Sequence, residues 1–146
     1  MLDESRINIY EYLYGKVYNV VTKNVYSMRE PQDLSRSDTL DGFVVIHVGD
    51  INDRSEFNRQ AYGWARCYIE AFVPQAPRGR LDIEKYRAFE DGINDIIYTS
   101  SKMADDTYSI DESSVLSMDG SETRNANNAY YTFIKSFIVN IDKTHK

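Results

Sequence analysis

A long alternation in the middle of the chain constrains the fold more than any other sequence feature. Between Arg59 and Val73, large aromatic side chains recur at even-numbered positions, and small or aliphatic side chains recur at odd-numbered positions. A period of two places successive side chains on opposite faces of a strand. Because both faces are largely apolar but differ in size, we expect a helix packed on one face and a partner surface on the other. The aromatic face holds Tyr62, Trp64, Tyr68 and Phe72, and the small face holds Ala61, Ala65, Cys67, Ile69 and Ala71.

A second strand is expected just before this alternation. Phe43–Val48 is a short apolar run rich in β-branched residues, with Asp41-Gly42 before it and Gly49-Asp50 after it. That pattern is typical of a buried strand in the middle of a sheet. We expect it to pair as a hairpin with the long strand, and we expect a further short extended segment over residues 25–28.

Apolar residues at steps of three and four predict two amphipathic helices. The first runs from Ser5, as N-cap, to about Val21. The second runs from about Asp82 to Ser100, and Gly92 within it is expected to let a strand approach closely. The expected buried stripes are Ile7, Tyr10, Leu13, Tyr14, Val17 and Val21 in the first helix and Ile83, Tyr86, Phe89, Ile93, Ile96 and Ile97 in the second.

The remaining segments complete one α+β domain over residues 1–146. Two strands are expected near the C-terminus, one around Tyr108 and Ile110 and one over residues 130–141, where apolar residues alternate around Lys135. The polar stretches 29–41 and 119–128 are predicted to be flexible loops, and residues 142–146 a frayed end. The expected architecture is a mostly antiparallel sheet of about four strands with helices on one face, in the order α-β-β-α-β-β.

Charge and cysteine content exclude several function classes. Among 146 residues, 17 Lys and Arg stand against 23 Asp and Glu, which gives a net charge of −6. Such a balance opposes binding to nucleic-acid phosphates and to anionic lipid surfaces. Cys67 is the only cysteine, so no internal disulfide forms, and the N-terminus lacks the pattern of a signal peptide. We therefore expect a protein made in a cytosol, with neither a membrane nor a nucleic acid as its specific partner.

No constellation in the sequence favours catalysis, a metal or a cofactor. Cys67 and His47 could form a nucleophile and base on neighbouring strands, but both lie in apolar strand patterns that core residues usually occupy. The acidic alternation that starts at Asp50 lacks the Gly and the bidentate Glu of a calcium loop, with Ser55 and Ala61 at those positions. The chain is therefore predicted to be non-enzymatic and to bind no metal or cofactor.

The order and length of the elements resemble a known group of viral proteins. The residues that carry the resemblance are 61–72, which lead into the helix at 82–97, and the closing strand at 130–139. Together they resemble the tail terminator and tail-completion proteins of long-tailed bacteriophages, with head-to-tail connector, or neck, proteins close behind. The resemblance implies a virion structural protein that is assembled in the host cytoplasm. It further implies a homo-oligomeric ring, commonly a hexamer, that caps the tail tube, joins it to the head connector and performs no catalysis.

A ring needs contact residues, and exposed loops and aromatic strand positions are the places to look for them. The contact residues predicted on this basis are Arg78, Arg80, Trp64, Tyr68, Asp119 and Arg124. An alternative from another class is a small ligand-binding or regulatory domain whose pocket is lined by Trp64, Tyr68 and Phe72. A Cys67-dependent enzyme is a third possibility, and it requires an exposed thiolate beside a cation.

Overall fold

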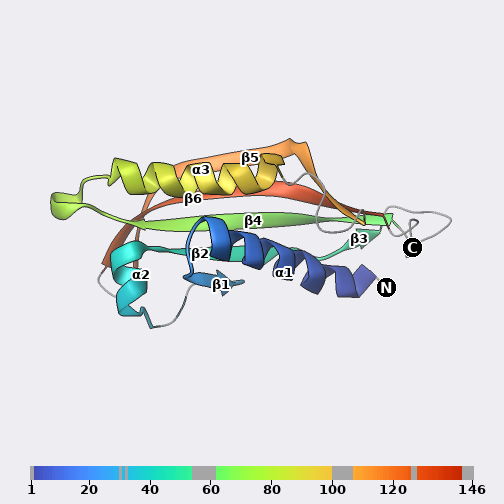
Figure 1. Cartoon of the computed structure of the whole chain (residues 1–146), viewed down its shortest axis with the longest axis horizontal. Coiled ribbons are helices and arrows are strands. Elements are labelled where there is room, and N and C mark those ends of the chain that lie inside the picture. The colour runs from blue at the N-terminus through green and yellow to red at the C-terminus, as the bar shows by residue number, and fades with distance from the viewer. Residues whose placement is uncertain are drawn as a thin grey trace.

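The computed structural model describes residues 2–29, 31, 33–53, 62–99, 107–125 and 128–142. These residues form three helices, one 3-10 turn and six strands (Figure 1). The elements are α1 (Leu2–Val20), β1 (Val25–Ser27), α2 (Arg36–Asp41), β2 (Phe43–Val48), β3 (Asn52–Asp53), β4 (Tyr62–Pro74), the 3-10 turn η1 (Pro77–Gly79), α3 (Ile83–Thr99), β5 (Tyr108–Asn125) and β6 (Asn128–Asp142).

The strands form one mixed sheet in the order β1-β2-β4-β6-β5, and β3 pairs with the start of β4. All neighbours are antiparallel except β1 and β2, which are parallel. The expected mostly antiparallel α+β sheet with an interior Phe43–Val48 strand is confirmed, and so is the pairing of that strand with β4. The predicted count of four strands and the predicted order α-β-β-α-β-β are wrong. The structure also contains β1, β3 and α2, which are too short to show a periodicity in the sequence.

Helices α1 and α3 cover one face of the sheet, which we call the covered face (Figure 1). The small side chains of β4 point into this face, so the predicted helix contact is confirmed. In α1 the buried residues are Ile9, Leu13 and Val17, whereas Ile7 is 62% exposed. The predicted stripe is confirmed at Leu13 and Val17, with Tyr10, Tyr14 and Val21 packed against the same core, and it is wrong only at Ile7. The structure also contradicts the predicted N-cap: Ser5 lies inside the helix, buried, and accepts a hydrogen bond from the Tyr108 hydroxyl at 3.2 Å.

Helix α3 follows the prediction except at its first residue, Ile83, which was expected in the buried stripe and is 59% exposed because it lies at the end of the helix. The Asp82 carboxylate accepts a hydrogen bond from the Lys85 N–H at 3.2 Å, as an N-terminal cap does. Phe89, Ile93, Ile96 and Ile97 are buried. The close approach at Gly92 is to helix α1 rather than to a strand: a Cβ there would lie 2.9 Å from Cγ2 of Val21. Glycine therefore sets the distance between the two helices.

The predicted loop 29–41 contains a helix, α2, that the sequence reading missed. Ser35 and Asp38 cap it reciprocally: each backbone N–H donates to the other's side chain at 3.0 Å. Asp38 is fully buried and accepts hydrogen bonds from the Tyr26 hydroxyl at 2.8 and 2.7 Å. Around it lies a second apolar cluster, on the opposite face of the sheet from α1 and α3, formed by Phe43, Val45, Phe72 and Tyr130 with Tyr26 and Leu34 against it.

The prediction of a flexible loop over residues 119–128 is also wrong. Strand β5 continues to Asn125, which pairs with Asn128 of β6, so the hairpin keeps its ladder nearly to its tip. A run of polar residues has the composition of a loop. It forms a strand here because the neighbouring strand supplies the hydrogen bonds, so an edge strand needs few apolar side chains. Asp142 pairs with Tyr62 in the sheet, and the rest of the predicted frayed end, residues 143–146, lies outside the described residues.

A charge introduced on the buried side of α3 tests the packing of the covered face. Ile93 is fully buried, so Ile93→Asp should lower the free energy of unfolding by about 4 kcal/mol or more, because an unpaired carboxylate would enter the core. Ile83→Asp is the matched control on the same helix, since Ile83 is 59% exposed. Urea unfolding checks both variants, and an unchanged midpoint for Ile93→Asp would contradict this packing.

Alkaline pH tests the hydrogen bond between the partly buried Tyr26 and the buried Asp38. Burial, followed by the hydrogen bond to the Asp38 carboxylate and the charge of that group, raises the pKa of Tyr26 from 10.0 to about 12. The resulting stabilisation is complete below pH 10, where both folded and unfolded chains keep the phenol protonated, and it is lost as the pH rises toward 12. Unfolding free energies across this range should fall less steeply for Tyr26→Phe than for wild type. Tyr98→Phe, at an exposed tyrosine, should keep the wild-type slope.

Candidate interaction surface

The face of β4, β6 and β5 opposite α1 and α3 is the candidate functional site, and we call it the open face. The second apolar cluster and α2 lie at one end of it, beside Phe72 and Tyr130. Beyond that end, the register aligns Tyr68 of β4 with Ser136 of β6, and Ser136 with Leu116 of β5. These side chains share a face because residues opposite one another in a ladder point the same way.

A hollow of about 430 Å³ lies in the open face. Two exposed apolar side chains border it, Leu116 at 61% and Met118 at 63% exposure, and Tyr68 is also exposed. Arg66 lines the hollow and donates a hydrogen bond from Nη1 to Ser136 Oγ at 3.0 Å. The hollow is lined by Arg66, Tyr68, Leu116, Ser117, Met118, Ile134 and Ser136.

An irregularity in β5 puts Leu116 in this position. The register shifts between Asp111, which pairs with Ile138, and Leu116, which pairs with Ser136. Within the shift, the Ser114 hydroxyl replaces a backbone partner: it accepts a hydrogen bond from the Ile138 N–H at 2.7 Å and donates one to the Asp111 carbonyl at 2.6 Å. Such bulges redirect side chains and disrupt the ladder at sheet edges. The bulge thereby aims Leu116 and Met118 at the hollow.

The six predicted contact residues do not form one site. Tyr68 lies in the hollow, whereas Trp64, half-buried, lies at the far end of β4, where it pairs with Asn52 and Asn140. Arg78 and Arg80 are exposed in the turn between β4 and α3, at the opposite end of the sheet. In β5, Asp119 pairs with Phe133 and Arg124 with Ala129, so Arg124 lies in the hairpin tip at the same end as Arg78.

Sequence reasoning missed Arg66, Leu116, Met118 and Ile134 as surface residues. Leu116 and Met118 do alternate in the sequence, which is a strand signal. Their exposure depends on the bulge, and the periodicity of the sequence does not predict where a bulge lies or how many residues it contains.

The three aromatic residues of the predicted ligand pocket are also separated. Phe72 is buried in the second apolar cluster, where its ring stacks on Phe43 with the centroids 4.4 Å apart. The prediction that Trp64, Tyr68 and Phe72 line one pocket is therefore wrong. Of the three, only Tyr68 lines the hollow.

Cys67 and His47 lie on opposite faces of the sheet. Cys67 pairs with Val48 and is buried in the covered face, whereas His47 pairs with Tyr68, its ring centroid 6.3 Å from the tyrosine's. Burial raises the pKa of the Cys67 thiol to about 12, and burial lowers the pKa of His47 below its ordinary value. The two side chains therefore cannot act as nucleophile and base together.

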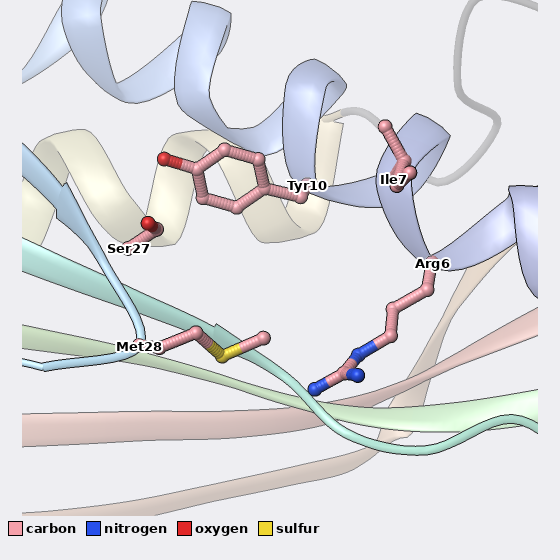
Figure 2. A pocket seen from close by; sticks show the side chains of 5 residues that line it. All are labelled: Arg6, Ile7, Tyr10, Ser27 and Met28. Carbon is pink, nitrogen blue, oxygen red and sulfur yellow. The ribbon is translucent and has the colours of Figure 1, made fainter.

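A smaller hollow of about 220 Å³ lies between α1 and the end of β1 (Figure 2). Arg6, Ile7, Tyr10, Ser27 and Met28 line it, and Figure 2 shows the Arg6 side chain reaching from α1 toward the strands. Arg6 Nε donates a hydrogen bond to the Val48 carbonyl at 2.9 Å, just beyond the point where β1 stops pairing with β2. Arg6 thus caps an edge carbonyl that the short β1 leaves without a strand partner.

In the described part of the chain, no group of three or more His, Cys, Asp and Glu side chains is placed to hold a metal ion. Over the same residues, no helix has the length and apolar character needed to span a bilayer.

The chain matches no protein-family model, and no curated protein matches it at a significant level.

Thiol labelling tests the placement of Cys67. Because the thiol is buried and its pKa is about 12, a thiol-specific reagent at neutral pH should react with it only when the chain unfolds. Leu116→Cys is the matched control on the same sheet, since that position is exposed and should label rapidly in the native protein. Fast labelling of native wild-type protein would contradict the buried position.

Proposed function

We propose that this chain is a non-enzymatic structural subunit of a tailed bacteriophage, forming a ring that terminates the tail tube and joins it to the head connector. The observation that carries the proposal is the open face, a rigid sheet surface whose exposed apolar side chains surround a hollow. An exposed apolar patch of this kind marks a contact surface more often than a solvated one. A chain that works by assembly requires such a surface.

The residue types on the open face support contact with protein. Tyr68, Met118 and Arg66 belong to the residue types enriched at the centres of protein interfaces. Arg66 is already fixed by its hydrogen bond to Ser136, so it would lose little conformational freedom on binding. The surface is therefore pre-organised for a partner.

The length of the strands supports a mechanical role. The open face rests on β4, β6 and β5, which span 13, 15 and 18 residues. Their other face packs against α1 and α3 in a continuous core. A surface backed in this way keeps its shape under load, as a subunit that joins two large assemblies must.

A second candidate is the ligand-binding domain, and one observation favours it. The hollow of about 430 Å³ falls within the volume range of small-molecule pockets, roughly 300–1,000 Å³. A ligand-binding domain would bind its ligand as a monomer, whereas a ring subunit needs the same surface for other chains. Oligomeric state therefore separates the two.

Two acidic substitutions on the open face test the proposed ring. Leu116→Glu/Met118→Glu should abolish assembly while leaving the melting temperature close to that of wild type, because both side chains are exposed. Ile7→Glu is the control, since Ile7 is equally exposed but lies on α1. Sedimentation at increasing concentration and electron microscopy of particles check assembly.

Complementation of a phage that lacks the gene tests the role in the virion. Wild type and Ile7→Glu should restore normal-length tails joined to heads, whereas the double variant should leave overlong tails or unjoined heads and tails. Normal joined tails in the deletion itself would refute the proposed function.

A further inference from the structure

The turn between β4 and α3 carries a second exposed surface, distinct from the open face. Residues 77–83 project beyond the end of the sheet, where Figure 1 shows η1 at the far left. Two apolar side chains are exposed in this turn, Leu81 at 40% and Ile83 at 59%. Arg78 and Arg80 are exposed beside them and form no ion pair with the residues that the structure describes. The turn therefore presents an apolar tip with two positive charges.

Hydrogen bonds hold the turn in one shape. The Ala76 N–H donates to the Arg80 carbonyl at 2.8 Å, and the Tyr131 hydroxyl of β6 donates to the Gly79 carbonyl at 2.9 Å. Arg78 and Gly79 both take positive φ angles, 69° and 72°, which fold the chain tightly. A projecting turn that is fixed before binding loses little entropy when it docks.

The open face has the complementary chemistry. Its hollow is bordered by Tyr68, Leu116 and Met118, which could receive an aliphatic side chain. Two carboxylates lie next to the hollow in register: Glu70 pairs with Ile134, and Asp111, whose carboxylate also accepts hydrogen bonds from Ser113, pairs with Ile138. Their two negative charges outnumber the one positive charge of Arg66 in the hollow. These carboxylates match the two arginines of the turn in charge.

A single chain cannot bring its own turn into its own hollow. The turn leads from the end of β4 into α3, which lies on the covered face, whereas the hollow lies on the open face beside Tyr68. Any contact between the two must therefore join two molecules. Because the contact uses two different surfaces, it is heterologous, and its repetition generates a ring or a filament.

We propose that the β4–α3 turn of one copy docks into the open-face hollow of the next copy. Leu81 enters the hollow between Tyr68, Leu116 and Met118, and Arg78 and Arg80 lie toward Glu70 and Asp111. This inference rests on the proposed ring, and it names the segment of the neighbouring copy that occupies the open face.

An engineered cysteine pair tests the contact. In the full chain, Leu81→Cys/Met118→Cys should form disulfides between copies under mild oxidation, both in concentrated purified protein and in complemented phage particles. A non-reducing gel should then show a ladder of dimers, trimers and larger species. Native Cys67 is buried and stays out of the reaction. Ile7→Cys/Met118→Cys is the control pair, because Ile7 belongs to neither surface, and it should give no ladder.

The outcomes separate this inference from the proposed function. A ladder that extends past the dimer supports head-to-tail docking. Dimers alone, or dimers from Met118→Cys without Leu81→Cys, would show a two-fold contact and overturn it. No ladder in protein or in particles, while sedimentation still shows oligomers, would overturn the docking and leave the ring standing. Normal joined tails without the gene would refute the proposed function itself.

Charge reversal gives an independent measurement. Arg78→Glu/Arg80→Glu should raise the concentration needed for assembly at least tenfold, and the effect should shrink in high salt because exposed ion pairs are screened. Arg29→Glu/Arg36→Glu is the matched control at two exposed arginines outside both surfaces. Equal effects of the two double variants would overturn the role of the turn.

Discussion

The close packing of two helices on the small-residue face of β4 is the constraint on which the rest of the structure depends. Strand β4 is paired on both sides, by β2 and β6, and its inward side chains include Ala65, Cys67 and Ala71. Short side chains there leave room for the longer ones that α1 and α3 bring, such as Leu13 and Ile93. The two helices also meet each other directly at Gly92. Because both helices pack on this face, most of the opposite face of β4, β6 and β5 is left uncovered.

A buried carboxylate closes one end of that other side. Asp38 sits within the short helix α2, where it accepts hydrogen bonds from the Ser35 N–H and from the Tyr26 hydroxyl. Its backbone carbonyl accepts a further hydrogen bond from the Tyr130 hydroxyl at 3.3 Å. One residue thus connects α2, β1 and β6, and it holds α2 over the apolar cluster around Phe43. Gly42 is required next to it, because a Cβ there would lie 2.4 Å from the Phe72 carbonyl oxygen.

Polar groups also fix the edge strand β5. Lys135 is buried on the covered face, where its Nζ lies 3.4 Å from Glu90 Oε2 of α3 and donates a hydrogen bond to Ser117 Oγ at 2.9 Å. A buried cation needs such partners, and they link β6, α3 and β5 in one arrangement. Together with the Ser114 bulge, this contact sets which side chains of β5 reach the open face. The candidate surface is therefore set by polar contacts around it as much as by its own apolar residues.

Elements with a strong periodicity can be located from the amino-acid sequence alone. The alternation of β4, the apolar run of β2 and the three-four spacing of α3 each arise because one side of the element meets a core, so these elements were predicted within a few residues. The same patterns predicted an aromatic face on β4 and a buried, unreactive Cys67. In α1 the same patterns predict the helix and most of its buried side, but its many tyrosines blur the edge of the stripe, so they place Ile7 inside and miss Ile9.

The short elements and the candidate surface depend on contacts between distant parts of the chain. α2 has too few residues to show a period, and its stability comes from the Ser35 and Asp38 cap and from Tyr26, which lies in another element. The polar half of β5 forms a strand because β6 supplies its hydrogen bonds, which no local propensity encodes. The hollow combines residues of three strands in a register set by a bulge, so Tyr68 could be named from the sequence, whereas its neighbours Leu116 and Met118 could not. Periodicity records which side of an element is buried, and only the pairing of distant strands determines which exposed side chains meet.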